Sequence, residues 1–84
     1  MNDQRPRSED RFGAVLRAGR LGAKLTQEAT ATAVGVKQST VSAWESGAAY
    51  PTAGNLVRLA DLYGLDEGDL LRRMVTETGA GVPA

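Results

Sequence analysis

The sequence contains neither cysteine nor histidine. Without cysteine the chain has no disulfide scaffold, no thiolate metal site and no cysteine nucleophile. Without histidine it lacks the usual general base and the commonest neutral metal ligand. We therefore expect no metal, no cofactor and no enzymatic activity.

Long apolar runs are also absent. No stretch approaches the roughly 18 residues that a membrane-spanning helix needs, and the first residues do not have the pattern of a signal peptide. The 84 residues are 42% hydrophobic with mixed charge, which is typical of a globular chain with room for one core. We expect one cytoplasmic domain without membrane contact.

The charges balance in number but are distributed unevenly. Residues 1–50 hold seven cations and five anions (+2), whereas residues 51–84 hold three cations and five anions (−2), so the net charge is zero. This division permits a basic face at one end, as nucleic-acid binding requires. The neutral total counts against tight non-specific binding to nucleic acid.

Apolar residues recur at helical spacing, and aromatic residues make up only 5% of the chain. We predict an all-α fold over residues 9–75, between a flexible arm of residues 1–8 and a disordered tail of residues 76–84. The expected helices run over 9–22, from Gln27 to just before Gly35, over 38–46, from after Thr52 to just before Gly64, and from after Asp66 to the tail. Five helices in one compact bundle is the predicted architecture.

Helix ends and buried faces can be assigned from residue type. Expected N-caps are Ser8, Thr26, Thr52 and Asp66. Gly35 suits a left-handed turn after the second helix. The first helix is expected to bury Phe12, Val15 and Leu16, and the second Ala29, Ala33 and Val34.

The central stretch carries the functional signal. It runs Leu25-Thr26-Gln27-Glu28 to Val36, then Ser39-Thr40-Val41-Ser42-Ala43-Trp44-Glu45-Ser46-Gly47, and closes with Pro51. Two short helices joined by a tight turn cross at a wide angle, so the second can project outward. A helix about 10–12 Å wide matches the major groove of B-DNA. With Val41 and Trp44 on the inner side, the outer face carries Lys37, Gln38, Ser39, Ser42 and Ala43.

This pattern resembles the lambda-repressor and Cro-type (XRE-like) helix-turn-helix DNA-binding family over about residues 11–74, including Gly64 to Leu71. The resemblance implies that Lys37, Gln38, Ser39, Ser42 and Ala43 face bases. It also implies that Gln27, Thr40 and Ser46 contact phosphates, and that Arg20 and Glu45 form a buried structural ion pair. An amide such as that of Gln38 can pair with adenine N6 and N7.

Three positions depart from the family pattern. Thr30 stands where the family has a core Leu or Val, so its hydroxyl must find a backbone carbonyl or stay exposed. Lys37 stands where Ser or Thr would cap the third helix, which predicts a less firm helix start. Ala43 replaces a longer polar residue and removes a DNA contact. We expect an intact fold with modest affinity per monomer.

The functional prediction is a sequence-specific, double-stranded DNA-binding transcriptional regulator that acts as a repressor. A homodimer packed through Leu70, Leu71 and Met74 would place two recognition helices about 34 Å apart, so the operator would be an inverted repeat. Arg5 and Arg7 either enter the minor groove or belong to an unengaged arm.

An alternative is a protein-interaction module on the same fold, such as an antitoxin or the partner of an anti-repressor. The neutral net charge and Ala43 favour this alternative. The distribution of charge discriminates between the two functions. DNA binding requires the side that carries Arg11, Arg17, Lys24 and Lys37 to be free of the C-terminal acids.

Overall fold

The computed structural model describes residues 11–79, which are helical with short connections and contain no strand. The five helices are α1 (Phe12–Gly22), α2 (Gln27–Val34), α3 (Gln38–Ser46), α4 (Ala53–Tyr63) and α5 (Glu67–Thr78). The prediction of an all-α five-helix bundle is therefore confirmed. The predicted arm, with Arg5 and Arg7, and residues 80–84 lie outside the described residues.

Local sequence signals set most of the helix ends. Hydroxyl oxygens of Thr26 and Thr52 accept hydrogen bonds from the third backbone N–H of α2 and α4, at 3.0 and 3.2 Å. The Asp66 carboxylate does the same for α5 at 2.8 Å. Gly35 adopts the left-handed conformation at φ 78° after α2, as predicted.

Both ends of the bundle differ from the prediction. Helix α1 begins at Phe12, later than the predicted residue 9, and its N-cap residue Arg11 makes no side-chain hydrogen bond. Ser8, the predicted cap, lies outside the described residues. Lys37 likewise gives α3 no side-chain cap, as expected from its residue type. Helix α5 continues through Thr78, so residues 76–78 are helical and do not belong to a disordered tail.

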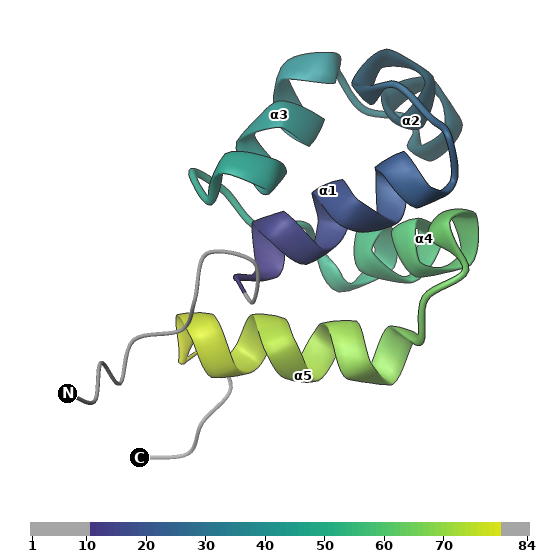
Figure 1. The fold of residues 1–84 in the computed structure, drawn as a ribbon. Coiled ribbons are helices and arrows are strands. Elements are labelled where there is room, and N and C mark those ends of the chain that lie inside the picture. The colour runs from purple at the N-terminus through teal and green to yellow at the C-terminus, as the bar shows by residue number, and fades with distance from the viewer. Residues whose placement is uncertain (1–10, 80–84) are drawn as a thin grey trace, which may run out of the picture.

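Helix α1 lies in the middle of the fold, with α2 and α3 on one side and α4 and α5 on the other (Figure 1). The core is formed by buried side chains from all five helices. Its largest fully buried members are Phe12, Leu16, Val41, Leu56, Leu59 and Leu70. Val15, expected in the core, is half-buried and packs against it.

The buried face of α2 differs from the expected one. Ala29 and Ala33 are exposed, and Thr30, Ala31 and Val34 face the core. Alternating alanine and threonine give this helix little apolar asymmetry, so neighbouring helices decide its rotation. Thr30 is fully buried, contrary to the expected carbonyl bond or exposure, and its Oγ1 accepts a 3.5 Å hydrogen bond from the Tyr63 hydroxyl.

Candidate nucleic-acid interface

A tight turn joins α2 to α3 and sets their relative direction. The backbone N–H groups of Gly35 and Val36 both donate to the Ala31 carbonyl, at 2.8 and 2.9 Å. Both bonds go to this one carbonyl in the last turn of α2, and the chain then leaves in a new direction for α3. The turn thus lets α3 stand on the outside of the fold (Figure 1).

Helix α3 has one buried side and one exposed side. Val41 and Trp44 are 1% and 3% exposed and anchor the helix to the core. Side chains at the start and along the opposite side are free of the core. The exposed group comprises Lys37, Gln38, Ser39 and Ser42, while Thr40 and Ala43 are half-buried. The outer face therefore offers an ammonium, an amide and two hydroxyls.

The residues expected to contact phosphates are partly engaged within the protein. The Gln27 amide donates to Glu45 Oε1 at 3.1 Å, which uses one of its two N–H groups. The Ser46 hydroxyl donates to the Ala43 carbonyl at 3.1 Å and accepts from the Ala48 N–H at 3.4 Å. Because Glu45 precedes Ser46, these contacts bring the start of α2 close to the end of α3.

Arg20 and Glu45 form a buried ion pair beneath this surface. Arg20 Nε and Nη2 donate to the two Glu45 oxygens at 2.7 and 3.0 Å, and Nη1 donates to the Leu25 carbonyl at 2.9 Å. The side chains are only 9% and 5% exposed. The hydrogen bond to Glu45 raises the Arg20 pKa. Together with Gln27, this Arg20–Glu45 network joins α1, the start of α2 and the end of α3.

Gly13 was not among the predicted site residues, yet it sets the distance between α1 and α3. A Cβ at this position would lie 2.4 Å from the Glu45 carbonyl oxygen and 2.7 Å from that of Trp44. The two backbones therefore meet directly. A glycine inside a helical pattern is the sequence signal for such a contact, although the signal does not name the opposing residue.

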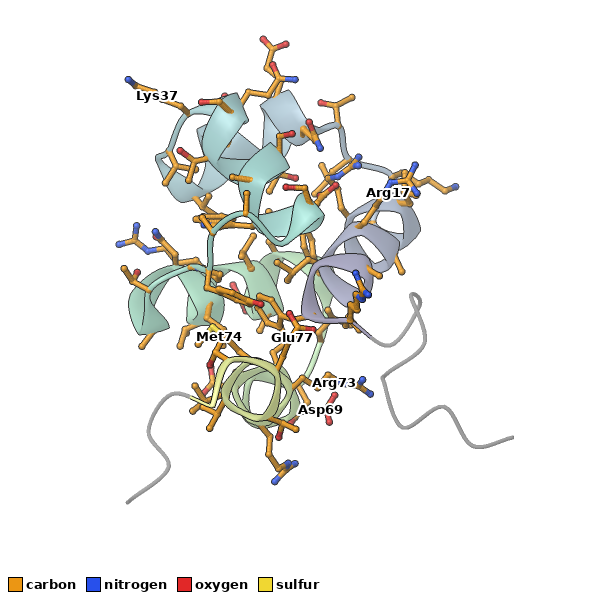
Figure 2. All side chains as sticks on the ribbon, turned by 90° about the vertical axis from the view of Figure 1, so that its left-hand side faces the viewer. Arg17, Lys37, Asp69, Arg73, Met74 and Glu77 are labelled. Atoms are coloured by element: carbon orange, nitrogen blue, oxygen red, sulfur yellow. The ribbon has the colours of Figure 1, made fainter. Side chains whose placement is uncertain are left out.

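The charges on the domain are separated in part. Lys37 and Arg17 lie in the upper half of the domain in Figure 2, whereas Asp69 and Glu77 lie on α5 at the bottom. Arg11 is different, because it lines an open groove of about 880 Å³ together with both of these acids. Arg17 and Lys37 thus both lie away from the labelled acids of α5, although Figure 2 shows them on opposite sides of the domain.

The predicted dimer residues on α5 do not form one exposed surface. Leu70 is 1% exposed and belongs to the core of the monomer, so its inclusion in a dimer interface was wrong. The helix turns Leu70 inward because it packs α5 onto the core. Met74 is half-buried, and Leu71 is 43% exposed.

A family model described as a helix-turn-helix domain matches residues 11–74, which is most of the chain. A comparison with curated proteins gave no match. Within the described residues, no helix combines the length and apolar character needed to cross a membrane. The same residues contain no cluster of three or more acidic metal ligands.

Proposed function

Because this chain belongs to the helix-turn-helix domains of the XRE or lambda-repressor type, which suggests DNA binding, we propose that it is a sequence-specific transcriptional regulator. Helix α3 enters the major groove and reads base edges. The observation that carries this proposal is the exposed hydrogen-bonding face of α3 on a helix anchored by Val41 and Trp44. Domains of this type are typically non-enzymatic, and we assign no catalytic role.

Base reading would come from the exposed side of α3. Gln38 stands in the first turn, where its amide can both donate to and accept from one adenine. Ser39 and Ser42 add short donors that tolerate several bases. Lys37 supplies a cation at the N-terminal end of the helix, close to where the phosphate backbone borders the groove.

Phosphate contacts would come from the start of α2 and the end of α3. The Thr26 hydroxyl already accepts the Ala29 N–H, so the free N–H groups of the first turn are earlier in α2 and can face an anion. Gln27 retains its second amide hydrogen for a phosphate oxygen. Ser46 must turn its hydroxyl away from the Ala43 carbonyl to donate to DNA, and Thr40 is the third proposed phosphate contact.

We propose that the protein forms a homodimer in the cytoplasm and acts as a repressor. The dimer would occupy an inverted-repeat operator and block polymerase. The dimer would use Leu71 and the accessible part of Met74 on α5, without Leu70. Two symmetric half-sites would place the recognition helices about 34 Å apart.

A protein-interaction module is the second candidate function. The net charge of zero and the short, half-buried side chain of Ala43 favour it, because both limit the attraction of α3 to DNA. In that case the outer face of α3 would bind a protein, as in an antitoxin or an anti-repressor complex. The two candidates differ in whether duplex DNA is bound at all.

Selection from a pool of random duplex DNA at two salt concentrations tests the main proposal. We expect an enriched inverted repeat whose affinity falls as salt rises, because phosphate contacts release counterions. Salt-sensitive binding without an enriched sequence would contradict sequence-specific recognition. The absence of any DNA binding would support the protein-interaction module.

Replacing Gln38 with alanine tests the reading helix directly. We expect Gln38→Ala to weaken operator binding by about 1–3 kcal/mol and to relax the preference at one base pair. Titration of the variant against the selected operator and against operators changed at single positions measures both effects. An equal loss on all duplexes would instead make Gln38 a phosphate contact, and Thr76→Ala on α5 serves as the exposed control.

A further inference from the structure

The side chain of Glu77 joins three segments that are far apart in the sequence. Its Oε1 accepts a 2.9 Å hydrogen bond from the backbone N–H of Phe12, 65 positions away. Its Oε2 accepts a 2.5 Å hydrogen bond from the hydroxyl of Tyr50, 27 positions away. Figure 2 shows Glu77 on the side of α5 that faces the rest of the domain. We call these contacts the Glu77 junction.

The first of these contacts satisfies the start of α1. Arg11 provides no side-chain cap, and the first turn of α1 contains no acidic residue. A helix start without a cap leaves N–H groups unpaired and carries a partial positive charge. The Glu77 carboxylate supplies both the acceptor and the negative charge from another helix. It therefore fixes the first turn of α1, which includes Gly13 in contact with α3.

The second contact holds the connection that follows α3. This segment begins with Gly47, Ala48 and Ala49, which have no polar side chains, so Tyr50 is its anchor. The Tyr50 ring packs against the buried Phe12 ring, with centroids 5.8 Å apart. The hydrogen bond to Glu77 raises the Tyr50 pKa and keeps its hydroxyl protonated as the donor. Pro51, which follows, is buried and leads into α4.

The two contacts act on the same end of α3. The backbone at Gly13 lies directly against the backbone of Trp44 and Glu45. Tyr50 anchors the connection four residues after Ser46. We propose that Glu77 is a positioning residue for DNA binding, which holds the C-terminal end of α3 and Ser46 at the distance where they reach a phosphate. This inference rests on the proposed function. It adds a residue beyond the matched range 11–74 to the DNA-binding unit.

The test compares variants on the duplex selected from the random pool. We expect Glu77→Ala to weaken binding by about tenfold, since it removes two hydrogen bonds to a charged group. Tyr50→Phe keeps the ring and the α1 contact but removes the second bond, and we expect a smaller loss. Glu77→Gln can still accept from Phe12 and bond to the Tyr50 oxygen, so we expect it to restore most of the affinity.

The matched control is Glu67→Ala, which removes an exposed acid from the first turn of the same helix. It reproduces the charge change without the two contacts. Ethylation interference identifies the individual phosphates that the protein contacts. A loss of stability alone would weaken all of these contacts and would not change their pattern. We expect Glu77→Ala to lose interference at the phosphates that Ser46→Ala also loses, while interference at the start of α2 remains.

Each outcome decides the proposal. Equal affinity of Glu77→Ala and Glu67→Ala, or a uniform loss of interference at all phosphates, would overturn it while leaving the proposed function intact. Failure of the wild-type chain to bind any duplex overturns the proposed function itself and is recognised before any variant is made. If circular dichroism shows that Glu77→Ala is unfolded, Tyr50→Phe decides by the same interference pattern.

Discussion

Two hydrogen-bonded junctions hold α1 in place, and they differ in burial. The Arg20–Glu45 network joins two nearly buried charged side chains and adds the Gln27 amide and the Leu25 carbonyl. The Glu77 junction also uses a carboxylate with two donors, but Glu77 and Tyr50 are exposed to solvent. Both contact the region where α1 meets the end of α3.

The difference in burial predicts a difference in role. An unpaired charge in a buried site is costly, so loss of either partner of the Arg20–Glu45 network destabilises the whole fold. Water can replace a lost partner at the Glu77 junction, so its loss changes geometry more than stability. We therefore expect loss of one partner of the buried network to lower stability, and loss of the exposed junction to change the position of α3.

Arg20→Ala removes the cationic partner of the buried ion pair. We expect it to lower the free energy of unfolding by about 3–5 kcal/mol, because Glu45 would stay buried without its counter-ion. Urea denaturation followed by circular dichroism measures the change. Arg17→Ala, an exposed arginine of the same helix, is the control. If Arg20→Ala lowered the free energy of unfolding no more than Arg17→Ala does, the buried network would not contribute more to stability than an exposed contact.

Gly13→Ala tests the backbone contact that lies between the junctions. We expect a loss of about 1–3 kcal/mol in the free energy of unfolding, because the new Cβ would overlap carbonyl oxygens that cannot move independently. Gly54→Ala in α4 meets open space and should be neutral or stabilising. Thermal unfolding of both variants is the measurement. Similar melting temperatures for the two variants would mean that α1 and α3 separate easily.

We expect alkaline pH to lower the stability of the fold less than these substitutions do. The effect would come from one tyrosine near each of the two junctions. Burial raises the pKa of Tyr63, near the Arg20–Glu45 network, above its ordinary value of 10.0. The hydrogen bond to Glu77 raises the pKa of Tyr50. A raised folded-state pKa stabilises the fold below pH 10 and loses that contribution as pH rises through the folded value.

Melting temperatures measured from neutral pH to above pH 10 check this expectation. Both Tyr63→Phe and Tyr50→Phe should flatten the decline, and Tyr63→Phe should do so more because its hydroxyl is buried. A decline that neither substitution changes would assign the pH dependence to other groups.

The helices could be predicted because their signals are local. Thr26, Thr52 and Asp66 cap their own helices, and Gly35 ends α2 through its own backbone conformation. Such contacts join residues three or four positions apart, so residue type and spacing contain the needed information. Helix α1 lacks a local cap, and its start was accordingly misplaced.

Contacts between helices could be predicted only in part. The resemblance indicated the Arg20–Glu45 pair, which does form. The resemblance placed Thr30 at a core position, but the local pattern of α2 did not indicate its bond to Tyr63. The local pattern of α5 likewise did not indicate that Leu70 would be buried and Leu71 exposed. These outcomes depend on how a helix rotates against its neighbours. Glu77 was assigned to a tail because its partners, Phe12 and Tyr50, are distant in sequence.

Because α5 extends to Thr78, we expect the smallest fragment that folds on its own to end after this helix. A fragment cut after residue 74 would keep the whole helix-turn-helix yet remove the acceptor for the first N–H of α1. Helix α5 would also lose its closing Gly79, whose N–H donates to Val75 at 2.7 Å. Truncation boundaries for expression or domain fusion therefore belong after Gly79, five residues beyond the end of the family match.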